Sequence, residues 1–115
     1  MTGDVAGARR EIDAVVKQSG DAVKSEYTHI RGTIEHLSGR YAEALALQQT
    51  ALEQITEGPA AEYARARVLI QLGLSQLKAG DAGARDTLER ALQLATKLGL
   101  HPDPLQADAR AALGR

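Results

Sequence analysis

The sequence predicts an all-α fold in which antiparallel helix hairpins stack as repeats, with about six helices in total. Alanine occurs 21 times and leucine 15 times in the 115 residues, and both are strong helix formers. No segment alternates apolar and polar residues over the length of a strand. Gly32 and Gly73 stand 41 residues apart in similar surroundings, a spacing typical of a helical repeat. These observations predict helix packed on helix, without a sheet.

Glycine and proline divide the chain into the predicted helices. Gly58-Pro59 is the strongest break, because proline cannot continue a helix. At Gly80-Asp81 we expect a helix stop followed by a capping aspartate, and at Asp103-Pro104 a cap followed by the first helical residue. Gln106, three residues after Asp103, permits a variant of the capping box. The predicted helices span about residues 4–19, 21–38, 41–57, 60–79, 82–98 and 103–114.

Each predicted helix carries an apolar stripe with spacings of three and four residues. The connecting loops are only a few residues long, so neighbouring helices should form antiparallel hairpins. The stripes consist mostly of alanine and leucine, and the only aromatic residues are three tyrosines. Such small side chains fill a core only where the helix backbones approach each other closely.

The 41-residue spacing extends beyond the two mid-helix glycines. Gly39 and Gly80 are also 41 residues apart, and Ala51-Leu52 recurs 40 residues later as Ala91-Leu92. A glycine inside a helix costs about 1 kcal/mol relative to alanine, so its recurrence at one place predicts a close helix contact there. A hairpin cannot bury its apolar face alone, whereas stacked hairpins share a core.

The repeat predicts the organisation of the chain as a single domain over residues 1–115. Its ends match parts of the repeat, since residues 4–19 resemble the second helix of a unit and residues 103–114 the start of a third. The predicted parts are a half-unit at 4–19, repeat 1 at 21–57, repeat 2 at 60–98, and a half-unit or capping helix at 103–114.

These residues resemble the tetratricopeptide repeat (TPR) family. Repeat 1 fits the family pattern at Gly32, Gly39, Tyr41, Glu43-Ala44-Leu45 and Ala51-Leu52. Repeat 2 fits it at Leu72-Gly73, Gly80-Asp81, Ala84, Leu88 and Ala91-Leu92. Gln48 departs from the pattern at a site where the family prefers an aromatic residue, and repeat 2 lacks the aromatic residue expected at its turn. The spacing is similar to that of the long-helix variety, which occurs in many bacterial regulators.

The resemblance implies a right-handed superhelical stack, a TPR-like α-solenoid, whose first helices line a concave face. In this family that face usually receives a peptide or a helix of a partner protein. We therefore expect the groove-facing positions of the two first helices to bind the partner. The candidate residues are Glu26, His29, Thr33 and His36 of segment 21–38, and Arg67, Ile70, Leu74 and Lys78 of segment 60–79.

Ile70 and Leu74 are the apolar members of this candidate site. If both are exposed, they form a patch suited to an amphipathic segment. The alternative is that they pack within the superhelix or under the N-terminal helix. The chain contains no asparagine, so it lacks the paired asparagines with which some repeats of this family hold the carboxylate of a chaperone tail.

The sequence thus predicts a non-catalytic adaptor or scaffold that binds a protein partner. The alternative is a self-associating structural element, a homo-oligomer such as a homodimer formed through exposed end helices. No convergent catalytic set supports an enzyme, and the absence of cysteine excludes thiol chemistry. A net charge of −1 and few aromatic residues argue against a nucleic-acid partner. No apolar run approaches the ~20 residues of a membrane helix, so we expect a cytoplasmic protein without membrane contact.

Glu26 and His29 form one Glu-x-x-His motif, but the helix-bundle metal sites that use this motif need two copies and further carboxylates. We therefore expect neither a metal nor a cofactor. His29 and His36 are seven residues apart and share a helix face, where both can titrate near neutral pH. A pH-sensing role stays open beside that of ordinary surface histidines.

Overall fold

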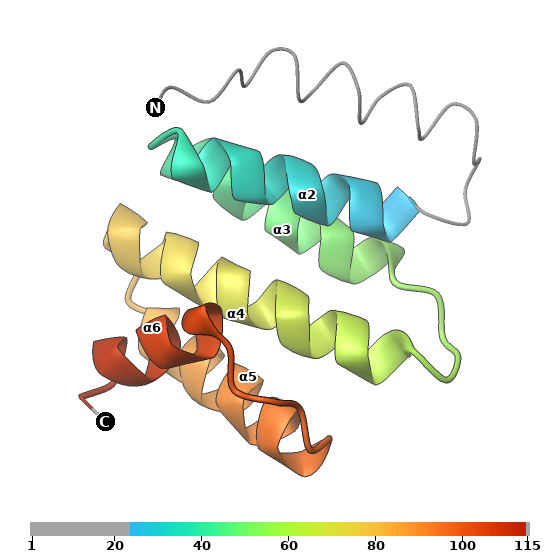
Figure 1. The fold of residues 1–115 in the computed structure, drawn as a ribbon. Helices are drawn as coiled ribbons and strands as arrows, with labels where there is room; N and C mark the ends of the chain where they lie inside the picture. The colour runs from blue at the N-terminus through green and yellow to red at the C-terminus, as the bar shows by residue number, and fades with distance from the viewer. Residues whose placement is uncertain (1–23, 115) are drawn as a thin grey trace.

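The computed structural model describes residues 24–114, and within this range the protein consists of five α-helices with no strand (Figure 1). The predicted all-α class is therefore confirmed for this part of the chain. The predicted helix at 4–19 lies outside the described residues. The helices are α2 (Lys24–Leu37), α3 (Tyr41–Gln54), α4 (Ala61–Ala79), α5 (Ala84–Lys97) and α6 (Pro104–Ala112).

The helix ends follow the predicted breaks, with two differences. Helix α3 stops at Gln54 rather than near residue 57, because Ile55 takes an extended backbone conformation. Helix α5 begins after Gly83 rather than after Asp81. The Asp81 carboxylate accepts a hydrogen bond from the Gly83 N–H at 2.8 Å, so it stabilises the preceding turn instead of capping the helix.

Asp103 caps α6 as predicted. Its carboxylate accepts a hydrogen bond from the Gln106 N–H at 2.8 Å, and Pro104 occupies the first turn. The expected capping box is not completed, because the Gln106 side chain donates to the carbonyl of His101 at 2.9 Å. Gln106 thus ties the loop before α6 to the helix.

The first helices of the two hairpins lie parallel, and each lies antiparallel to its own second helix (Figure 1). The hydrogen bonds between α2 and α3 show that these helices are antiparallel. Ser25 bonds to the Ala51 carbonyl, whereas His29, later in α2, bonds to Gln48, earlier in α3. Helices α2 and α4 run in the same direction, because Glu26 contacts Arg67 and, further along both helices, His36 contacts Ser75. The offsets of 41 and 39 residues equal the repeat spacing or fall close to it.

Both hairpins are closest at the mid-helix glycines, as predicted. A Cβ atom on Gly32 would stand 2.6 Å from the Gln48 Nε2. A Cβ atom on Gly73 would stand 2.5 Å from the Leu88 Cδ2 and 3.2 Å from the Leu88 backbone nitrogen. Leu88 lies 40 residues after Gln48, so the same contact occurs at equivalent positions of both hairpins. These distances leave no room for a side chain at either glycine.

The main apolar core lies between α4, α5 and α6. Leu45 and Leu52 of α3 pack against its edge. Ala109 of α6 and Leu113, just past the end of that helix, complete the cluster. The buried members are Leu69, Ile70, Leu72, Leu74, Leu88, Ala91, Leu92, Ala109 and Leu113.

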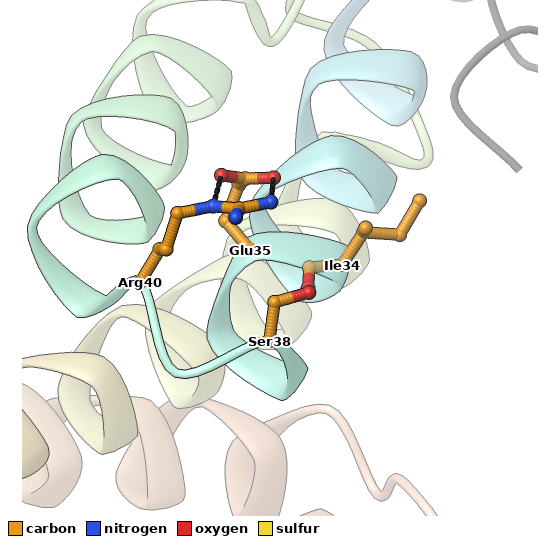
Figure 2. Close-up of polar contacts among 4 residues, drawn as sticks. All are labelled: Ile34, Glu35, Ser38 and Arg40. Carbon is orange, nitrogen blue, oxygen red and sulfur yellow. Dashed lines mark hydrogen bonds and ion pairs between the residues drawn. The ribbon is translucent and has the colours of Figure 1, made fainter. Parts of the chain in front are cut away.

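An ion pair closes the turn between α2 and α3 (Figure 2). The Arg40 guanidinium donates through Nε and a terminal nitrogen to the two oxygens of Glu35, at 2.7 and 3.2 Å. Glu35 is buried, whereas Arg40 is exposed. The Ser38 hydroxyl donates to the Ile34 carbonyl at 2.8 Å, which satisfies an acceptor at the end of α2. The turn is thus held by side chains as well as by Gly39, whose φ is +80°.

Replacing Gly73 with leucine should lower the free energy of unfolding by about 1–3 kcal/mol, because the new side chain overpacks the contact with Leu88. Thermal unfolding followed by circular dichroism measures this loss. Gly58→Ala is the matched control, since a Cβ there meets nothing within 4 Å. Equal stability of the Gly73→Leu variant and the native chain would contradict the close approach.

Replacing Arg40 with alanine should lower the free energy of unfolding by about 1–2 kcal/mol, because the buried Glu35 loses its two-pronged partner. Arg40→Lys keeps the positive charge but not the two parallel hydrogen bonds. Its free energy of unfolding should therefore lie between those of the Arg40→Ala variant and the native chain. Chemical denaturation at neutral pH measures both. Identical midpoints for all three chains would show that the pair adds no stability.

Candidate interaction surface

The predicted binding residues do not form one open surface. Ile70 and Leu74, expected as an exposed apolar patch, are buried, with 3% and 9% of their surfaces accessible. They belong to the main core cluster, which also includes Ala109 and Leu113, and α5 and α6 both pack against α4. The prediction of an exposed Ile70–Leu74 patch was wrong, and its alternative, packing within the structure, holds.

Glu26 and Arg67 face each other instead of an open groove. Their side chains form an ion pair of 3.2 Å that joins α2 to α4, and both residues are exposed. An exposed pair of this kind contributes little to stability, typically about 0–1 kcal/mol. It connects residues one repeat length apart, in line with the parallel register of the two helices.

His36 makes the second contact between α2 and α4. Its Nδ1 lies 2.9 Å from the hydroxyl of the buried Ser75. The Tyr41 ring packs edge-on, with 5.3 Å between the ring centroids. Burial, and secondly the positive charge of Lys78, lower the pKa of His36 below its ordinary value.

His29 was expected to line the groove, but it is buried between α2 and α3. Its Nδ1 lies 3.1 Å from the Gln48 Oε1. An amide oxygen only accepts, so the Nδ1 of His29 carries the hydrogen. Burial is the largest effect on the His29 pKa and lowers it, although the hydrogen bond to Gln48 opposes this shift. The Gln48 Nε2 is buried without a hydrogen-bond partner.

The two remaining candidates have different surroundings. Thr33 donates its hydroxyl to the His29 carbonyl within α2, at 3.1 Å. Lys78 is exposed at the end of α4.

We use the name polar seam for the contact between α2 and α4. On α4, Gln71 lies midway between Arg67 and Ser75 at helical spacing and therefore shares their face. Its side chain is buried, and its Oε1 has no hydrogen-bond partner. The seam consists of Glu26 and His36 on α2 and Arg67, Gln71 and Ser75 on α4.

The sequence reasoning missed Ser75 and Gln71. Helical spacing could have found them, because both lie on the same face of α4 as Arg67, four and eight residues further on. The repeat spacing could have found the Glu26–Arg67 pair, because an offset of 41 residues from Glu26 points directly to Arg67. The offset therefore predicts this contact between α2 and α4, whereas the family resemblance implied a groove.

The exposed apolar side chains lie elsewhere on the same two helices. Leu37 of α2 exposes 79% of its surface, and Tyr63 and Leu77 of α4 expose 45% and 46%. Ile30 of α2 is exposed to a smaller extent. Among the described residues no other large apolar side chain is this exposed, so α2 and α4 carry the whole set.

A hollow of about 290 Å³ beside the start of α2 and the α3–α4 loop is lined by Ser25, Glu26 and Gln54, among others. Ser25 donates its hydroxyl to the Ala51 carbonyl at 2.9 Å, so it is engaged in the hairpin. Residues 24–114 contain no group of three or more histidine, aspartate or glutamate side chains placed to hold a metal ion.

No family model, curated protein or solved structure matches the chain. Across the part of the chain that the structure describes, every helix is too short or too polar to cross a membrane.

The buried polar pair of repeat 1 has apolar equivalents in repeat 2. His29 corresponds to Ile70 at an offset of 41 residues, and Gln48 corresponds to Leu88 at an offset of 40. Replacing a buried polar pair by apolar side chains of similar size often stabilises a protein. Removing only one partner destabilises it, because the other polar group stays buried without a hydrogen bond.

The double variant His29→Ile with Gln48→Leu should therefore raise the free energy of unfolding by about 1–2 kcal/mol. His29→Ile alone should lower it, because Gln48 then loses its hydrogen-bond partner while it stays buried. Chemical denaturation of the two variants beside the native chain gives both differences. A double variant less stable than His29→Ile would contradict this account of the pair.

Proposed function

We propose that the protein is a non-catalytic interaction module, a TPR-like α-solenoid that binds a peptide or helix of a partner protein on the side presented by α2 and α4. The observation that carries the proposal is the confinement of the exposed large apolar side chains of the described residues to these two helices. Such side chains gain about 1.5–3 kcal/mol each when a partner buries them fully.

The parallel alignment of α2 and α4 supports the same assignment. Helix α4 repeats the direction of α2 one unit later, and the glycine contact recurs in both hairpins. A solenoid built in this way presents its first helices side by side along one surface. The binding residues are Leu37, Tyr63 and Leu77, with Arg67 and Lys78 as polar neighbours, and they replace the buried Ile70 and Leu74.

Self-association through the end helices receives less support at the C-terminal end. The buried residues of α6, Gln106 and Ala109, face the core together with Leu113. Its exposed residues are small or polar, namely Pro104, Ala107, Asp108 and Ala111. No exposed large apolar side chain lies on α6, so this helix presents a solvated outer face.

A binding selection tests the proposal. A library of displayed peptides is selected on the full chain, and each selected peptide is then measured against Leu37→Asp with Leu77→Asp. We expect this variant to lose at least about tenfold in affinity, because it removes the apolar contacts and adds charge. Gln49→Asp, on the exposed side of α3, is the matched control and should bind as the native chain does.

Circular dichroism of the double variant must show unchanged helix content, since Leu37 and Leu77 are exposed and their replacement leaves the core intact. Peptides that bind the native chain and the Leu37/Leu77 variant equally well would place the binding surface elsewhere. Light scattering of the unliganded protein addresses self-association, and a dimer that dissociates in the Leu37/Leu77 variant would favour that alternative over a separate partner.

A further inference from the structure

Two histidines of α2 take no part in the proposed binding surface. His29 and His36 are seven residues apart and both turn toward the neighbouring helices. His29 hydrogen-bonds Gln48 of α3, and His36 hydrogen-bonds Ser75 of α4. The two imidazoles therefore connect α2 to α3 and α4, the helices that pack against it within residues 24–114.

The groups around His36 make a positive charge unfavourable there. From α4, Ser75 offers a neutral hydroxyl and Lys78 a positive charge. From α3, the Tyr41 ring covers one edge of the imidazole. Among the residues that the structure describes, no carboxylate contributes to the shift of the His36 pKa, so none of them compensates a protonated ring for its burial.

The groups around His29 include some that favour and some that disfavour a positive charge, and their net effect also lowers its pKa. Gln48 of α3 accepts its Nδ1 hydrogen, Arg67 of α4 repels a positive charge, and Glu26 of α2 attracts one. Glu26 is already engaged with Arg67, which weakens its effect on the imidazole. Burial of the ring outweighs the favourable contributions.

We propose that His29 and His36 form a pH-sensitive latch, which holds α2 against α3 and α4 while both rings are neutral and releases α2 when they become protonated. This inference is independent of the proposed binding function.

The direction of the pH effect follows from linkage. Both histidines have a lowered pKa in the folded protein, so the unfolded chain binds protons more readily. The stability that the neutral rings contribute is present in full above the ordinary histidine pKa of about 6.5. It is lost as the pH falls below that value toward the lowered pKa of each ring. Each unit by which a pKa is lowered makes about a tenfold difference in the ratio of latched to released protein.

Helix α2 is the element that yields, because its contacts are polar. The polar seam joins α2 to α4 through an exposed ion pair and the His36–Ser75 hydrogen bond. Helices α4, α5 and α6 instead share the main apolar core, which contains no titratable group. Acidification therefore acts on the first hairpin and leaves the second one folded.

Repeat 2 supplies the matched variants. The residues 41 positions after His29 and His36 are Ile70 and Leu77. The latch-free chain is His29→Ile with Gln48→Leu and His36→Leu, in which no imidazole is left in α2. His101→Gln is the control, because His101 lies exposed in the loop before α6.

Amide hydrogen exchange of the full chain tests the latch at about pH 7.5 and about pH 5. After correction for intrinsic exchange rates, protection of the α2 amides should fall at least about tenfold in the native chain, while that of α5 changes little. The His101→Gln control should show the same loss. The latch-free chain should show no selective loss in α2.

Titration of the histidine ring protons by NMR provides a measurement that needs no variant. We expect the midpoints of His29 and His36 to lie below the ordinary histidine value. Midpoints at or above that value would overturn the proposal. So would an equal loss of protection in α2 and α5, or the same loss in the latch-free chain.

Discussion

The close approach of the two helices in each hairpin is the constraint on which the rest of the structure depends. At Gly73 the backbone of α4 comes so near to Leu88 that even a methyl group would clash with it. This contact brings the alanine-rich faces within reach of each other, since alanine side chains fill a core only between closely spaced backbones. The same contact at Gly32 gives α2 and α3 their spacing, and the two hairpins can then stack with a common register.

The two hairpins share this geometry but not the chemistry of their interiors. The second hairpin and α6 bury a continuous apolar cluster around Leu88. The first hairpin buries His29 and Gln48 at the equivalent positions and adds hydrogen bonds such as that from Thr28 to Gln54, at 2.5 Å. Apolar contacts keep their strength at any pH, whereas buried polar groups depend on their partners and on their protonation state. The main apolar core and the histidines of the proposed latch therefore lie in different halves of the described chain.

The polar seam bears on the proposed contact of α2 and α4 with a partner. Glu26 and Arg67 satisfy each other, and His36 is engaged with Ser75, so these polar groups hold the two first helices in place. The side chains left for an external contact are apolar ones such as Leu37 and Leu77. An arrangement of this kind separates the residues that set the relative position of the helices from those available for binding.

The sequence by itself determined the helices, the hairpins and the close contacts at the glycines, because these depend on local propensity and on a spacing that is written in the chain. It identified Gly73 as a contact point and Asp103 as a helix cap, and the structure agrees on both. Tertiary structure alone decided which helix faces stayed open. Periodicity shows that Ile70 and Leu74 share a face, but only the packing of α4 with α5 and α6 makes both residues part of the core. The helical pattern of a sequence shows in which direction a side chain points from the helix axis. The packing of the whole molecule decides which neighbouring element, if any, covers that side chain.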